Sequence, residues 1–101
     1  MPMTANGLAK LLEELGELSQ AAAKKLAYFH TDEHPDGAGS LSQRLEQEMG
    51  DVCGAIMFVT HTLKLDRMAI NDRALAKLST FRKWHADPDN GAEDFNAQPA
   101  A

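Results

Sequence analysis

Apolar residues recur every three or four positions over long stretches of the chain, a spacing that places them on one face of an α-helix. The first stretch runs from about Thr4 or Asn6 to about Phe29 and is rich in Ala, Leu, Glu and Lys, which favour helices. Its apolar positions are Leu8, Leu11, Leu12, Leu15, Leu18, Ala22, Leu26 and Phe29. The spacing therefore predicts a long amphipathic helix in the first third of the chain.

The segment HTDEHPDGAG, residues 30–39, interrupts this pattern with a proline, two glycines and several short polar residues, which predicts a loop. A second helix is expected to follow, capped by Ser40 or Ser42. Ser40 with Gln43 three residues later resembles a capping box, in which a serine side chain satisfies a free backbone N–H group. This helix is expected to continue to about Lys64.

The second half of that helix is unusually apolar. Residues 52–63 contain no Asp, Glu, Lys or Arg, which predicts that most of the helix circumference is buried and that this is the central helix. Asp66 is placed to cap a third helix that reaches about His85, with an interruption considered near residues 71–72. Residues 87–101 have helix breakers and little periodicity, and they predict a flexible C-terminal tail.

Together these elements predict an all-α protein in which an antiparallel helical hairpin is followed by a third helix. A chain of 101 residues fits one domain, here assigned to residues 1–86. So short a chain buries only a modest core. Gly16, Ala23 and Ala27 also share a small-residue face that permits close helix approach. We therefore expect a helical bundle completed by a homodimer or a higher homo-oligomer.

The acidic charge balance narrows the classes of partner. The chain has 15 Asp and Glu against 10 Lys and Arg, a formal net charge of -5, whereas nucleic-acid-binding proteins carry a basic surface. No apolar run approaches the roughly 18 residues of a membrane span, so no membrane partner is expected. Cys53 is the single cysteine, which excludes an intrachain disulfide and favours a cytoplasmic location.

The candidate chemistry lies in two pairs of acidic residues on separate predicted helices. Glu14 and Glu17 are three residues apart, as are Glu48 and Asp51. Residues with this spacing project from neighbouring turns on roughly the same side of a helix, so each pair offers two oxygen ligands. If the helices pack antiparallel, the two pairs converge. Carboxylate oxygens suit magnesium, or manganese in its place.

The position of Glu48 on its helix distinguishes it from an ordinary surface acid. With about 100° between successive residues, Leu41, Val52 and Val59 lie within about 40° of Glu48 on the helical wheel. A carboxylate on an apolar stripe is costly unless something neutralises it. Glu13 points away from the apolar stripe of its own helix, so it is expected to face solvent or to support the ligands. The alternative is that all these acids are solvated surface charges.

The words LAKLLEELGELSQAAAKKL, LEQEMGDV and AKLSTFRKW carry a resemblance to a known family. The pattern EExxE followed later by ExxD is similar to that of MazG-like all-α nucleotide pyrophosphohydrolases, of the compact phage or bacterial type. The resemblance covers roughly residues 8–84. It implies that Glu14, Glu17, Glu48 and Asp51 bind magnesium and are catalytic, and that the chain hydrolyses a nucleoside triphosphate to a monophosphate and pyrophosphate. A related family, phosphoribosyl-ATP pyrophosphatase, has similar chemistry on another substrate.

An anionic substrate also requires cationic side chains. Lys24 and Lys25 follow the first acidic pair by two to three helical turns, and Lys77 and Arg82 lie in the segment that resembles the distal basic motif of the family. These four are the candidate phosphate-binding residues. The competing interpretation of the whole chain is a nucleotide-binding module without catalysis, or a helical dimerisation or regulatory module, with a vestigial acidic site.

Several other residues invite weaker hypotheses. His30 and His34 flank the predicted loop, but no cysteine or second-helix histidine completes a transition-metal site with them, so ordinary loop histidines are expected. Cys53 lies among apolar residues and is expected in the core rather than as a nucleophile. Tyr28 or Trp84 is a candidate for stacking on a nucleotide base, although packing roles are expected first.

Overall fold

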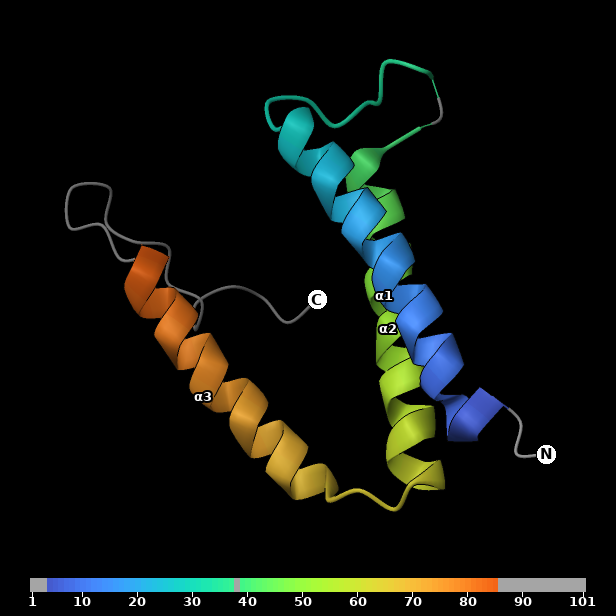
Figure 1. Cartoon of the computed structure of the whole chain (residues 1–101). Helices are drawn as coiled ribbons and strands as arrows, with labels where there is room; N and C mark the ends of the chain where they lie inside the picture. Colours follow the sequence, from blue (N-terminus) through green and yellow to red (C-terminus); the bar gives the residue numbers. More distant parts are fainter. Residues whose placement is uncertain (1–3, 38, 86–101) are drawn as a thin grey trace. The chain divides into compact units, whose positions relative to one another are not determined.

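Three helices make up most of the chain (Figure 1). The structure, a computed structural model, describes residues 4–37 and 39–85, with the side chains of Thr4 and Asn6 excepted. The helices are α1 (Thr4–Ala27), α2 (Leu41–Thr62) and α3 (Arg67–His85). Within the described ranges the β structure consists of an isolated bridge between Glu33 and Ser40, so the all-α prediction is confirmed. The interruption considered near residues 71–72 is absent, because α3 runs through them.

The chain divides into two compact units, Met1–Leu65 and Asp66–Ala101. The first contains the hairpin of α1 and α2, and the second contains α3. The division falls in the short connection after α2. The domain predicted for residues 1–86 stays a prediction, and the tail predicted at residues 87–101 lies outside the described residues.

Helices α1 and α2 pack side by side in opposite directions, as the antiparallel hairpin was predicted to do (Figure 1). The hydrophobic residues that this packing buries are small or medium in size, namely Ala21, Leu41, Val52, Ala55 and Val59. Alanines at the contact let the two helix backbones approach closely. The prediction that most of the circumference of α2 is buried is wrong for the hairpin, since α1 covers one face and leaves Met49, Met57 and Phe58 exposed.

Two of the predicted helix caps are present. Ser40 is the N-cap of α2, and its hydroxyl accepts a hydrogen bond of 3.1 Å from the backbone N–H of Gln43. The carboxylate of Asp66 accepts one of 3.1 Å from the backbone N–H of Ala69 in the first turn of α3. Each cap satisfies a backbone donor that has no partner within its own helix. These contacts explain where α2 and α3 begin.

Asp32 fastens the loop between α1 and α2 to the start of α2. Its carboxylate accepts hydrogen bonds from the hydroxyls of Ser40 and Ser42 and from the Ser42 backbone N–H, the last at 2.9 Å. Lys25 Nζ lies 3.6 Å from Asp32 Oδ1 and donates to the Thr31 carbonyl. The two hydroxyl hydrogen bonds are the main reason that the pKa of Asp32 falls from 3.8 to about 2.

We predict that Asp32→Ala destabilises the hairpin at neutral pH. A carboxyl group whose pKa is lowered in the folded state stabilises that state above its unfolded pKa, and this contribution is lost as the pH falls through the folded pKa. The difference in melting temperature between wild type and Asp32→Ala should therefore shrink between pH 3.8 and about 2. Circular dichroism melts across this range measure it. Glu33→Ala, which removes the neighbouring carboxylate, should show no such pH-dependent difference.

Candidate metal centre

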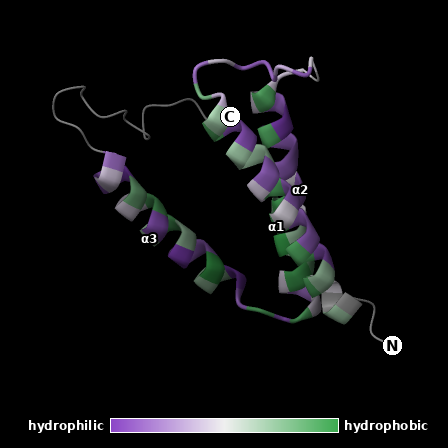
Figure 2. Ribbon diagram, turned by 45° about the horizontal axis from the view of Figure 1, so that its top comes forward, coloured by the Kyte–Doolittle hydropathy of each residue, from purple (hydrophilic) through white to green (hydrophobic). Residues whose placement is uncertain are grey.

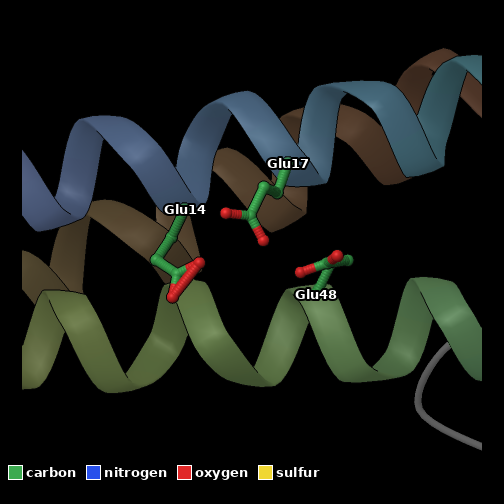
Figure 3. A group of neighbouring side chains, drawn as sticks. All are labelled: Glu14, Glu17 and Glu48. Atoms are coloured by element: carbon green, nitrogen blue, oxygen red, sulfur yellow. The ribbon is translucent and has the colours of Figure 1, made fainter.

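The acidic residues of α1 and α2 meet across the hairpin. Glu14 and Glu17 extend from α1 toward α2, and Glu48 extends from α2 toward them (Figure 3). One carboxylate oxygen from each residue lies within 4.8 Å of the other two, and all three residues are half-buried. The spacing of three residues places Glu14 and Glu17 on successive turns of α1. The antiparallel packing then brings the matching turn of α2 opposite both of them.

Glu48 occupies the face of α2 that packs against α1. At about 100° per residue, Leu41, Ala55 and Val59 lie within about 20° of Glu48 on the helical wheel, and all three are buried. Glu48 Oε1 is shielded from solvent, and it has no hydrogen-bond partner among the described residues. A buried carboxylate oxygen without a partner carries the full cost of its desolvation. This oxygen is therefore placed where a bound cation would compensate that cost.

The negative charges that gather at Glu14, Glu17 and Glu48 favour the binding of either protons or a cation. Partial burial raises the pKa of Glu48, and the negative charges of Glu17 and Asp51 raise it further. Burial followed by the charges of Glu17 and Asp51 also raises the pKa of Glu14. Each raised pKa means that ionising the carboxyl group is opposed first by its burial and then by the charges of its neighbours. A divalent cation would reverse this balance by favouring the ionised forms.

Asp51, the fourth predicted ligand, lies beside the other three. It is exposed on α2, one turn after Glu48, and it is not part of the group whose oxygens lie within 4.8 Å. Its charge and a hydrogen bond with Glu48 nevertheless contribute to the raised pKa of Glu48. The structure thus brings three predicted ligands together and leaves Asp51 at the solvent edge. Its role as a ligand stays a prediction.

A lysine that the sequence interpretation overlooked stands next to these acids. Lys10 Nζ lies 3.1 Å from Glu13 Oε1, and both side chains are exposed. This contact, with the charges of Glu13, Glu14 and Glu17, raises the pKa of Lys10. The pattern was visible in the chain, because Lys10 precedes Glu13 by three residues and Glu14 by four, the spacings that place side chains next to each other on a helix. Glu13 faces solvent, as predicted from its helical phase.

The four predicted phosphate-binding residues lie in different parts of the structure. Lys24 is half-buried on α1, in nearly the same helical phase as Glu17 and about 10 Å further along the axis. Lys25 is engaged at the loop with Thr31 and Asp32. Lys77 is exposed and Arg82 half-buried on α3, which belongs to the second unit.

The aromatic and histidine candidates pack against residues that are close to them in the sequence. The Tyr28 ring lies edge-on against His34, and the Phe29 ring lies edge-on against His30. On α3 the ring of Trp84 packs against Phe81 with centroids 5.3 Å apart. The free Cys53 is exposed, so its predicted core position is wrong. Its position on α2 turns it away from the face that contacts α1.

The geometry suits a hard, oxygen-binding cation. Oxygens that share an octahedral magnesium ion at about 2.0–2.1 Å lie about 3–4 Å apart. The three carboxylate oxygens, within 4.8 Å of one another, lie near such a spacing. Carboxylates on rigid helices, with no sulfur or imidazole among them, match magnesium or manganese better than zinc or copper.

The comparisons with known proteins gave no relative. No family model, curated protein or solved structure matches this chain. Among the described residues, no helix combines the length and apolarity needed to span a membrane. The acidic group and the motifs that contain it are therefore the features of this chain that bear on function.

Proposed function

We propose that this chain is a magnesium-dependent nucleoside triphosphate pyrophosphohydrolase of the MazG-like type, acting in the cytoplasm. The observation that carries the proposal is the shielded, unpartnered Glu48 Oε1, which faces Glu14 and Glu17 on the opposite helix. An acidic side chain with no role beyond surface charge would keep its oxygens in contact with water. The order of the motifs, EExxE on α1 and ExxD on α2, supports the nucleotide substrate through the family resemblance described above.

The chain's own groups have distinct tasks in this proposal. Glu14, Glu17 and Glu48 would hold the cation, and Asp51 would supply further negative charge at the solvent edge. Bound magnesium supplies Lewis-acid chemistry toward phosphate oxygens and water. In the reaction, a water oxygen bonds to the α-phosphorus while the bond to the pyrophosphate oxygen breaks. Glu14 or Glu17 accepts the proton of that water.

The cationic groups belong to the same proposal. Lys10 and Lys24, both on α1 with the two glutamates, are the lysines that we propose for binding the β- and γ-phosphates. Their positive charge would help to offset the charge that develops on the leaving pyrophosphate. Lys25, whose ammonium group contacts Thr31 and Asp32, keeps its predicted role as a proposal. Lys77 and Arg82 keep their predicted roles as proposals.

A product assay tests the function. The protein is incubated with a panel of ribonucleoside and deoxyribonucleoside triphosphates in magnesium, and the products are separated by ion-exchange chromatography. We expect equal amounts of monophosphate and pyrophosphate from at least one substrate, and no reaction in EDTA. Release of diphosphate and orthophosphate would contradict the proposed bond cleavage. Nucleotide binding in calorimetry without any product would instead favour the non-catalytic alternative.

A further inference from the structure

Two half-buried cationic residues of the hairpin have no anionic partner. They are Lys24 on α1 and Arg44 on α2. Neither forms an ion pair with a described residue, whereas Lys10 and Lys25 each pair with a carboxylate. A cation that is partly removed from water without an anionic partner destabilises the fold. An anion bound to Lys24 and Arg44 would compensate that cost.

Helical phase places both cations on one side of the hairpin, together with the acidic group. Polar and apolar segments alternate along α1 and α2 (Figure 2). At about 100° per residue, Lys24 lies about 20° from Glu17 on α1, and Arg44 lies about 20° from Asp51 on α2. Glu17 and Asp51 each precede the centre of the buried face of their own helix by about 70–80°. Because the helices are antiparallel, these equal offsets lie on the same side of the pair.

The register of the hairpin also places the two cations close together along its axis. Glu17 and Glu48 meet across the hairpin, which fixes the residues that face each other. Arg44 precedes Glu48 by four residues, so in an antiparallel pair it faces about position 21 of α1. Lys24 is three residues further along α1, about 4–5 Å along the axis. Both residues therefore lie on the side of the acidic group toward the loop.

The tilt of helical side chains directs the two cations toward the same place. Side chains lean toward the N-terminus of their own helix. Lys24 therefore leans toward the level of Arg44, and Arg44 leans away from Glu48 toward the level of Lys24. This direction also agrees with the absence of an ion pair between Arg44 and Glu48. The cationic groups thus converge about one helical turn from the acidic group.

We propose that Arg44 and Lys24 form a phosphate subsite that binds the terminal phosphate of the nucleoside triphosphate, beside the acidic group. This inference rests on the proposed function and extends it with Arg44, which lies outside both acidic motifs. The guanidinium of Arg44 offers a planar fork that matches two phosphate oxygens, and Lys24 adds a compact positive charge. The phosphate chain of the substrate then runs from the acidic group toward the loop between α1 and α2.

The test uses substitutions that each remove one positive charge. Binding of inorganic pyrophosphate, the proposed product, is measured by calorimetry in saturating magnesium. Arg44→Met and Lys24→Met should each weaken binding by about 10-fold or more, since each loses a charge-assisted hydrogen bond. Arg44→Lys, which keeps the charge without the planar fork, should lose less. Lys64→Met is the matched control and should bind like wild type, because exposed Lys64 follows α2, roughly 25 Å along the axis from Arg44.

Thermal melts distinguish lost anion binding from damaged packing. In EDTA without pyrophosphate, Arg44→Met should melt no lower than wild type, because methionine keeps an apolar stem and one of two neighbouring like charges is gone. Magnesium alone should raise the melting temperature of Arg44→Met at least as much as that of wild type, since a nearby positive charge opposes cation binding. A variant with damaged packing would instead melt lower and lose the response to both ligands.

The subsite is overturned by undiminished pyrophosphate binding in Arg44→Met, by an equal loss in Lys64→Met, or by a wild type that does not bind pyrophosphate. A lower melting temperature of Arg44→Met with a lost magnesium response overturns it as well. Triphosphate hydrolysis by the wild type would in each case leave the enzymatic proposal standing. If no hydrolysis is found while Arg44→Met selectively weakens pyrophosphate binding, the enzymatic proposal fails and the phosphate subsite remains.

Discussion

Glu48→Gln is expected to lower magnesium-dependent hydrolysis by at least about 100-fold, since replacing groups that merely support a metal ligand already costs about 10–100-fold. The amide keeps the size of the side chain but removes the negative charge that would hold the cation. The same substitution should raise the melting temperature in EDTA. Burial and neighbouring charges oppose ionisation of Glu48, so without a cation the charged form destabilises the fold above its raised pKa. Steady-state kinetics and thermal melts measure the two effects.

Glu46→Gln provides the matched control. Glu46 is an exposed acid on α2, two residues before Glu48 and on the opposite side of the helix, and the substitution makes the same change of charge. It should leave both activity and the effect of magnesium on the melting temperature near wild-type values. Full activity in Glu48→Gln, or equal losses in both variants, would contradict the assignment. A magnesium-dependent rise in melting temperature that persists in Glu48→Gln would do so independently of any substrate.

The predictable parts of this structure have local causes in the chain. The periodicity of α1, the breakers of residues 30–39 and the serine at position 40 each act within a few residues, and the predicted elements agree with the observed ones to within two residues. The convergence of Glu14 and Glu17 with Glu48 also followed from local information. An acid on an apolar stripe needs compensation, and antiparallel helices bring the two stripes together.

The predictions that were wrong concern side chains whose exposure depends on which helix faces pack together. A run without charges, such as residues 52–63, shows that a helix can be buried but not what covers it, and α1 covers one face only. Cys53 was assigned to the core for the same reason. Lys10 is an exception, because the acids that raise its pKa, Glu13, Glu14 and Glu17, all lie on the same helix and were within reach of sequence reasoning. Fold class is thus easier to predict than the exposure of any one side chain.

Gly7 illustrates a constraint that helical periodicity does not reveal. It lies in the first turns of α1, is buried and has a φ of 92°, a conformation that L-residues rarely adopt. A Cβ atom added there would lie 2.5 Å from Cδ2 of Phe58 and 3.3 Å from Cγ2 of Val59. The absence of a side chain therefore lets α1 contact the C-terminal half of α2, which helps to set the register between the two helices.

Gly7→Ala is expected to destabilise the hairpin by roughly 2–4 kcal/mol, combining the cost of an unfavourable φ with that of overpacking. This corresponds to a fall in melting temperature of about 10–20 °C for a chain of this size. Gly54→Ala is the matched control, because a Cβ atom at Gly54 has nothing within 4 Å. That substitution should instead stabilise by about 0.5–1 kcal/mol, as alanine is favoured over glycine inside a helix. If both variants melted alike, the contact between Gly7 and Phe58 would not set the packing of α1 on α2.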